Sequence, residues 1–461
     1  MLFSSITFIY FFLPFVALYF LVPQKYKNAF LLLVSLIFYF SGEPVYISLL
    51  FISSVSDWLH GIYIESHRGK KSAKAALISA ILINVLLLGI FKYTDFIIAT
   101  INAVFNLSIP LTGIVLPIGI SFFTFQTMSY TIDVYRGDAH AQKNLTSFAT
   151  FVCLFPQLIA GPIVRYTDVA AELEERNSTI EKVSDGIRRF CVGLGKKVLI
   201  ANLLGELCTN FSQSQDKSVL FYWIYAIAFS LQIYFDFSGY SDMAIGLGKI
   251  LGFNFPENFN YPYISRSVTE FWRRWHMTLG GWFRDYVYIP LGGNRVNTLK
   301  WVRNIAAVWL LTGIWHGAQW NFVLWGAAFG VVLLLEKLFI SKLLSKLPSF
   351  VGVIYTSLLV VLNFVVFNAN GLAGVVQDFK GLFGTGDIPL VSYDALYNLK
   401  SYAFVIIVAL IGCTPYPKKL WEKFIGKSAV VLEPLGAALL LVSSTAFIVN
   451  GSFNPFLYFR F

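Results

Sequence analysis

Long apolar runs separated by short polar segments dominate the chain. A transmembrane helix needs about 20 mostly apolar residues, so these runs are candidate membrane spans. Seventeen residues, Ile6–Val22, are long enough for the first span. Further candidates lie at Asn28–Ser41, at Pro44–Ile64 and near residues 75–98, 113–132, 190–211, 219–250, 350–369, 401–413 and 429–449. The pattern predicts ten to twelve spanning or re-entrant helices.

Two segments depart from this pattern. Residues 147–162 carry two prolines and a glycine, and residues 165–189 are amphiphilic and mixed in charge. Proline ends a helix and glycine tolerates the resulting turn, so we expect re-entrant or interfacial structure in both segments.

Composition supports the membrane assignment. Hydrophobic residues make up 57% of the chain and charged residues 13%, which indicates a polytopic membrane protein. The amino terminus lacks the basic leader and cleavage site of a secretory signal, so we expect the first apolar run to be retained. The four cysteines form no CxxC pair, which favours packing roles over a disulfide framework or a metal site.

The net charge of +10 reports orientation rather than a nucleic-acid partner, because lysines and arginines cluster in short loops between apolar runs. Basic loops follow at 25–27, 68–74, 337–346 and 418–427. Placing these loops in the cytoplasm puts the amino terminus outside. The less basic segment 370–398 is then external as well.

The longest hydrophilic stretch, Arg266–Arg303, contains seven Lys or Arg residues and two acidic ones. At about 100° per residue, a helix here has an apolar face and a charged face, with His276 at the edge of the apolar one. The apolar face holds Trp272, Trp275, Leu279, Trp282, Phe283 and Tyr286, and the charged face holds Arg273, Arg274, Arg284 and Asp285. We expect a helix at the cytoplasmic membrane surface. It serves either as a lipid anchor or as a site where Arg273 and Arg274 bind a phosphorylated donor such as a coenzyme thioester.

The segment Asn304–Glu336 contains 33 residues, and its only charged side chain is the last. One straight helix of that length measures roughly 50 Å, against a hydrocarbon core of about 30 Å. Because both flanks are basic, we expect the segment to enter the membrane and return, with a turn near Gly313–Gly317. A steeply tilted or broken single span is the alternative.

Either path puts His316, in the sequence Trp315-His316-Gly317, near the middle of the membrane. An ionisable group at that depth is costly and usually functional. Thr312, Gln319 and Trp320 are helical neighbours that are placed to orient the ring. The alternative is a histidine bonded to a backbone carbonyl for packing.

Other polar residues interrupt the apolar runs. Asp236 and Asp242 fall on different faces of a helix, so they are not a paired acid and base, and interhelical hydrogen bonding is the expected role. Asn258 lies in a loop that leads into the Arg-rich segment, and a plain connector is the alternative for that loop.

The chain resembles the membrane-bound O-acyltransferase family, and within it the alginate O-acetyltransferase branch. The resemblance covers nearly the whole chain. Its carriers are MLFSSITFIYFFLP at the start, PIGISFFTFQTMSYTIDVYRG at 117–137, FPQLIAGPIVR at 155–165, YFDFSGYSDMAIGLG at 234–248, NFNYPYISRSVTEFWRRWHMTLGGWFRDYVYIPLGGNR at 258–295 and LTGIWHGAQWNFVLWGAAFG at 311–330.

The resemblance implies that His316 is catalytic and that His276 is a second functional position. It implies transfer of an acetyl group from a cytoplasmic donor, acetyl-CoA or another acyl thioester, to a hydroxyl of an exported or cell-surface polysaccharide. It also implies an extracytoplasmic SGNH-type acetyltransferase as partner and a multi-pass location in the cell membrane. No bound cofactor and no metal are expected.

This chemistry suits the residues. A buried histidine is biased toward its neutral form, and a neutral imidazole can accept the proton of an alcohol that attacks a thioester. No Ser or Cys lies near His316 in the sequence, which favours direct transfer over an acyl-enzyme. Candidates for stabilising the oxyanion are the tryptophan indoles, Gln319 and backbone N–H groups. Trp275, Trp315, Asp236 and Asn258 complete the candidate donor or substrate-tunnel residues.

Two alternatives remain open at this stage. One is D-alanyl transfer to teichoic acid by the related branch of the family, and the other is a non-catalytic transporter or export component. The fold expected is all-α, with its helices around a central tunnel and short interfacial helices. We expect one membrane domain over 1–461, with peripheral helices at about 1–100, a core at about 110–336 and C-terminal helices at about 350–461.

Overall fold

A computed structural model describes residues 3–451 and residue 457. Regular secondary structure in these residues is helical throughout, which confirms the all-α prediction. The chain forms two compact units, one made of residues 1–190 and 242–256 and the other of residues 191–241 and 257–461. The single domain expected over 1–461 stays a prediction.

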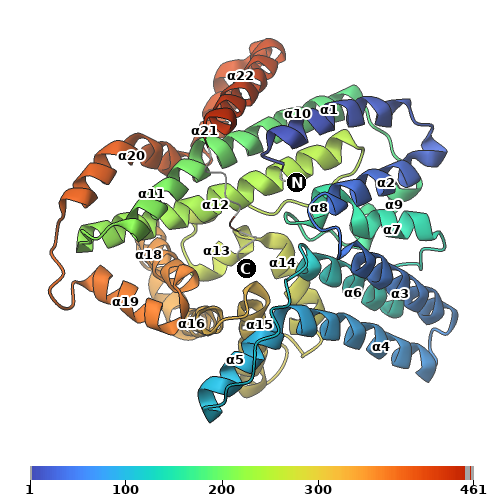
Figure 1. Cartoon of the computed structure of the whole chain (residues 1–461), viewed down its shortest axis with the longest axis horizontal. Coiled ribbons are helices and arrows are strands. Elements are labelled where there is room, and N and C mark those ends of the chain that lie inside the picture. Colours follow the sequence, from blue (N-terminus) through green and yellow to red (C-terminus); the bar gives the residue numbers. More distant parts are fainter. Residues whose placement is uncertain (1–2, 452–456, 458–461) are drawn as a thin grey trace. The chain divides into compact units, whose positions relative to one another are not determined.

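The first unit, which we call unit 1, contains the N-terminal helices (Figure 1). These are α1 (Ile6–Leu21), α2 (Lys27–Phe40), α3 (Ile47–Ser66), α4 (Lys71–Leu88), α5 (Thr94–Phe105), α6 (Ile120–Arg136), α7 (Leu145–Cys153), α8 (Phe155–Leu158), α9 (Tyr166–Glu174) and most of α10 (Ile180–Gly195). All residues from 147 to 164 are buried, so the proline-containing segment is a broken helix inside this unit.

Helices α3, α4 and α6 pack side by side in unit 1 around buried polar residues (Figure 1). The side-chain amide of Asn84 donates to both carboxylate oxygens of Asp57, at 3.0 and 2.9 Å. The hydroxyl of Thr127 donates in turn to Asn84. Hydrogen bonds between helices are one of the ways in which membrane helices are held together.

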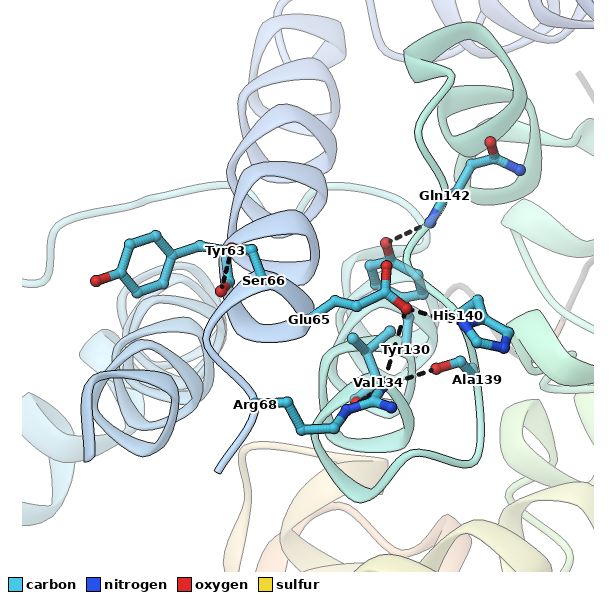
Figure 2. Close-up of polar contacts among 9 residues, drawn as sticks. All are labelled: Tyr63, Glu65, Ser66, Arg68, Tyr130, Val134, Ala139, His140 and Gln142. Atoms are coloured by element: carbon cyan, nitrogen blue, oxygen red, sulfur yellow. Dashed lines mark hydrogen bonds and ion pairs between the residues drawn. The ribbon is translucent and has the colours of Figure 1, made fainter. Parts of the chain in front are cut away.

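The loop after α6 is fixed to the C-terminal end of α3 (Figure 2). The guanidinium group of Arg68 donates to the carbonyl oxygen of Val134 at 2.9 Å, and Nδ1 of His140 lies 3.0 Å from the Glu65 carboxylate. Further along the loop, the backbone N–H of Gln142 donates to the Tyr130 hydroxyl. Glu65 of α3 and Tyr130 of α6 therefore hold the segment that follows Gly137, while Arg68, just after α3, binds the end of α6.

The second unit, unit 2, holds the remaining helices (Figure 1). These are α11 (Asn202–Gln213), most of α12 (Val219–Ile250), α13 (Val268–Arg274), α14 (Met277–Phe283), α15 (Thr298–His316), α16 (Trp320–Leu335), α17 (Ser341–Leu344), α18 (Ser349–Asn368), α19 (Gly371–Phe383), α20 (Tyr393–Gly412), α21 (Tyr416–Ile425) and α22 (Ala429–Asn450). Four π-type turns, η2 (Gly89–Tyr93), η3 (Lys196–Ala201), η5 (Arg284–Tyr288) and η6 (Glu336–Ile340), continue helices of either unit.

Helix α12 lies in the core of unit 2, where the negative charge of its residue Asp236 is balanced by a buried lysine. The ammonium group of Lys197 lies 2.8 Å from Asp236, with each side chain only 3% exposed. The other carboxylate oxygen of Asp236 accepts the backbone N–H of Leu457. Asp242 pairs separately with Arg189 at 2.9 Å. The polar groups of this apolar run therefore connect helices, as the sequence predicted.

Within the described residues, seven helices are long and apolar enough to cross a membrane, and α1 is a shorter apolar helix. The seven include α3, α12, α18, α20 and α22, together with the runs Lys71–Phe105 and Trp320–Leu344. This confirms a multi-pass membrane protein. The span predicted near 113–132 corresponds to the shorter helix α6, and the span predicted near 190–211 covers the end of α10, η3 and most of α11, which are consecutive in the chain.

Candidate active site

Helices α15 and α16 form a hairpin that places His316 at its turn. The last residue of α15 is His316, and α16 begins at Trp320. A methyl group added at Gly313 would collide with the carbonyl oxygen of Phe322, and one added at Gly326 with that of Trp309. The two glycines thus let the helix backbones touch. The prediction of a segment that turns near Gly313–Gly317 is confirmed, with the turn at residues 317–319.

Aromatic rings surround the imidazole of His316, which is 8% exposed. Its centroid lies 5.1 Å from that of Trp325 and 5.4 Å from that of Phe367, both in edge-to-face geometry. Trp325 comes from α16 and Phe367 from α18. A ring held on several sides by aromatic neighbours has little freedom to change rotamer.

A small cavity adjoins His316. The space free of protein atoms is about 310 Å³, part of it open to the outside. Its lining residues are Ile233, Phe237, Trp275, His316, Trp325, Phe364 and Phe367. Among these lining residues, His316 is the only one with an ionisable side chain, and the others are aliphatic or aromatic. A charge that develops in such a cavity has few polar groups to stabilise it.

The indole of Trp325 brings an unused donor to this lining. Trp325 is 1% exposed, and its Nε1–H has no hydrogen-bond partner within the described part of the chain. A buried donor without a partner costs about 1–3 kcal/mol. The hydroxyl of Thr312, a predicted orienting neighbour, donates instead to the carbonyl oxygen of Val308 in its own helix.

His276 occupies a sharp break between α13 and α14. Its backbone is left-handed, with φ 43° and ψ 53°, and its side chain is 2% exposed. The sequence predicted one continuous amphipathic helix with its apolar face toward lipid, and both parts of that prediction are wrong, while the location at the cytoplasmic membrane surface stays a prediction. The chain bends at Trp275-His276, and the face with Trp275, Leu279 and Trp282 is buried inside the protein. The periodicity was correct, but its apolar face covers protein and not lipid.

Asn258 holds this break in place. Its backbone oxygen accepts the N–H of Met277 at 3.0 Å. Its side-chain oxygen lies 3.1 Å from Nδ1 of His276 and accepts the hydroxyl of Thr278 at 3.0 Å. The amide nitrogen donates to Ser241 at 3.1 Å. A left-handed residue other than glycine costs about 1–3 kcal/mol, so these bonds offset a strained turn.

The bonds of Asn258 also set the tautomer of His276. The backbone N–H of Thr278 needs an acceptor and faces the Asn258 side chain, which fixes the amide oxygen on that side. The oxygen can only accept, so Nδ1 of His276 carries the proton and Nε2 keeps a lone pair. Burial, and next the nearby His316, hold the pKa of His276 well below its ordinary 6.5. His276 is therefore neutral at neutral pH.

The two histidines share aromatic neighbours. The Trp315 ring centroid lies 6.1 Å from that of His276 and 5.0 Å from that of His316. Phe237, which lines the cavity beside His316, packs edge-on against His276 at 4.7 Å. The structure thus brings together His316, His276, Trp315, Trp275 and Asn258 from the predicted set.

Other predicted residues lie elsewhere. The guanidinium of Arg274 pairs with Glu270 at 2.9 Å and donates to the carbonyl oxygen of Asn260, so it fixes local structure. Arg273 is exposed and Gln319 is exposed at the hairpin turn. Asp236 is engaged with Lys197 and is not among the cavity-lining residues.

The sequence did not single out Trp325 or the phenylalanines of the cavity. Phe364 and Phe367 lie on α18, and Phe237 and Ile233 on α12, far from His316 along the chain. An apolar residue in an apolar span looks like its neighbours in the sequence, so nothing marks it as part of a cavity. Trp325, nine residues after His316, is likewise one of several tryptophans in this part of the chain. Residues 3–451 and 457 contain no cluster of three or more His, Cys, Asp or Glu side chains suited to a metal.

This fold and this site define a multi-pass helical membrane protein with two buried histidines, of which His316 lines a small apolar cavity. The model of the membrane-bound O-acyltransferase family matches residues 141–374, which include the cavity and both histidines. The chain belongs to the membrane-bound O-acyltransferase family, and the protein is an enzyme, an O-acyltransferase. The family expected from the sequence is thereby confirmed.

Curated relatives extend the comparison. The chain is 37% identical over 505 residues to "Probable alginate O-acetylase AlgI" of Azotobacter vinelandii, with 100% of both chains covered. It is 31% identical to a peptidoglycan O-acetyltransferase of Helicobacter pylori, covering 100% of this chain and 98% of the relative. A teichoic acid D-alanyltransferase of Bacillus subtilis is 30% identical, over 54% of this chain and 67% of the relative.

Proposed function

We propose that this enzyme transfers an acetyl group from a cytoplasmic thioester, acetyl-CoA or a related donor, for O-acetylation of an exported or cell-surface polysaccharide. One observation carries the proposal: His316 lines a small apolar cavity together with Trp325, whose indole N–H has no hydrogen-bond partner among the described residues. Full-length similarity to proteins named for O-acetylation of alginate and of peptidoglycan supports the acetyl group and the polymeric acceptor.

In the proposed reaction, His316 is the general base. The acceptor hydroxyl attacks the thioester carbonyl carbon while its proton passes to the imidazole. The tetrahedral intermediate collapses with cleavage of the carbon–sulfur bond, and the proton passes from His316 to the departing thiolate. An ester and a thiol result, so protons and electrons balance without a further reactant.

The Nε1–H of Trp325 is the proposed donor to the oxyanion. The Trp325 ring packs against His316 and lines the cavity, and its N–H has no hydrogen-bond partner among the described residues. A donor that is already in place when charge develops stabilises the transition state without reorganising. This assignment selects one indole from the several that the sequence offered.

His276 and the arginines have supporting roles in this proposal. His276 packs beside Trp315, a position suited to orienting the acyl donor or the acceptor. Arg273 is exposed on α13, and its planar guanidinium suits the phosphates of a coenzyme. We place the enzyme in the inner or plasma membrane with its amino terminus outside, working with an extracytoplasmic SGNH-type partner.

Inverted membrane vesicles supplied with isotopically labelled acetyl-CoA test the function. Label should reach an acceptor with the wild type and not with His316→Ala, while Glu422→Gln, an exposed change on α21, should behave as wild type. Persistent acetylation in His316→Ala with failed polymer export would point to an export component. Capture of a carrier protein, with no response to acetyl-CoA, would favour D-alanyl transfer.

A further inference from the structure

Glu336 is a buried carboxylate that the reaction does not use. It closes the segment Asn304–Glu336 as its only charged side chain, and it is 0% exposed. One carboxylate oxygen accepts the backbone N–H of Val268, at 2.6 Å. The other accepts the backbone N–H and the hydroxyl of Thr269, at 2.9 and 2.8 Å.

These bonds cap α13 from another helix. The first N–H groups of a helix have no partner inside it, and Glu336 takes the first two of α13. The hydroxyl oxygen of Ser267 takes the N–H of Glu270, completing the cap. Charge-assisted bonds of this kind are short and about twice as strong as neutral ones, which offsets the cost of burying the carboxylate.

The position of Glu336 connects this cap to the catalytic base. Trp325 and Glu336 are separated by eleven residues, about three helical turns, so they lie on the same side of the helical run, roughly 16 Å apart. Trp325 packs against His316, and Glu336 binds the start of α13. The helix α16 therefore holds the base at one end and α13 at the other.

The far end of α13 leads directly into His276. Between the two ends, Trp272 packs edge-on against Trp325 at 5.7 Å and Trp309 at 4.8 Å. Trp275, the residue after α13, lines the cavity. A displacement of α13 along α16 would move Trp275 and His276 relative to His316.

We propose that Glu336 is a positioning residue: by capping α13 from the end of α16, it fixes where Trp275 and His276 lie relative to His316. The inference rests on the proposed function for its kinetic consequence. The cap itself does not depend on that function. Glu336→Gln tests it, because the amide keeps the size of the side chain but replaces one acceptor oxygen with a donor.

Amide hydrogen exchange on the intact protein in detergent measures directly how well the first N–H groups of α13 are protected by the cap. In Glu336→Gln, peptides covering residues 266–276 should exchange about tenfold faster, since the first N–H groups of α13 lose an acceptor. Peptides from α20 should be unchanged. Glu336→Asp, which is one methylene shorter, should fall between wild type and Gln, and Glu422→Gln should match wild type.

Acetyl transfer supplies the second readout. Turnover of Glu336→Gln should fall about 100-fold, with the KM for the donor within about twofold of wild type, because misplacement of catalytic groups acts on the chemical step. Unchanged exchange over 266–276 overturns the cap. Faster exchange with wild-type turnover overturns the positioning role. If the wild type shows no acetyl transfer, the proposed function fails, while hydrogen exchange still decides the cap.

Discussion

The imidazole of His276 and the indole of Trp315 meet edge-on, with ring centroids 6.1 Å apart. Trp315 is the residue before His316, so the second histidine packs against the helix end that carries the first. The turn at His276 and the end of α15 therefore form one arrangement. We therefore expect a substitution at either histidine to shift the position of the other imidazole.

Replacing Trp325 by Phe should lower turnover about 100-fold or more, because the variant loses the N–H that faces no other partner and keeps the aromatic packing. The donor KM should change little. Trp272→Phe is the matched control, since its indole N–H is also buried without a partner among the described residues but Trp272 does not line the cavity. Equal losses in both variants would remove Trp325 from the mechanism.

Stability should decline as pH falls below about 6.5. The pKa of folded His276 lies well below the ordinary value of 6.5, so the unfolded chain binds more protons in that range and acid favours unfolding. At higher pH this contribution is constant. Thermal unfolding in detergent between about pH 5 and pH 8 measures the trend, and His276→Gln should flatten it. An equally steep trend in that variant would assign it to other groups.

Gly326→Ala should destabilise the hairpin by about 1–3 kcal/mol, the usual cost of forcing extra volume into a packed interface. Its methyl group would collide with the carbonyl oxygen of Trp309. Turnover should fall with it, because α15 ends at His316. Gly89→Ala, where no atom beyond its chain neighbours and its own helix backbone lies within 4 Å of the added carbon, is the control for the substitution itself. Wild-type melting of Gly326→Ala would contradict the close packing.

Asp236→Asn should cost about 3–5 kcal/mol, since it leaves the Lys197 ammonium group buried without its counter-charge. The double change Lys197→Met with Asp236→Leu should recover part of that loss. Asp185→Asn breaks a half-exposed pair with Arg188 and should cost no more than about 1 kcal/mol. Turnover per folded molecule should be unchanged in Asp236→Asn, and a large loss would return Asp236 to the substrate path.

Much of the fold followed from the length and flanking charge of apolar runs. The hairpin at His316 is the clearest case, because a 33-residue segment with no charge before its last residue, between basic flanks, is too long for one span. The break in the helix at His276 could not be predicted from these features of the sequence. A helical wheel assigns a direction to every residue, so it carries no sign that one residue adopts left-handed backbone.

The residues that line the cavity could not be predicted from the sequence either. Phe364 and Phe367 reach His316 through the packing of α18 against α16, a tertiary relationship that composition does not encode. The role of Glu336 was equally hidden, because a carboxylate at the end of an apolar run usually marks the edge of a membrane span. Its partners, the first N–H groups of α13, lie 67 and 68 residues away in the sequence.

The glycine contact in the hairpin has a consequence for access. With Gly313 and Gly326 backbone against backbone, α15 and α16 have no free space in which to slide or separate without opening a void. His316, the last residue of α15, therefore belongs to the rigid side of the cavity. Any rearrangement of the cavity therefore has to come from its other lining residues, which include Phe237 of α12 and Phe364 and Phe367 of α18.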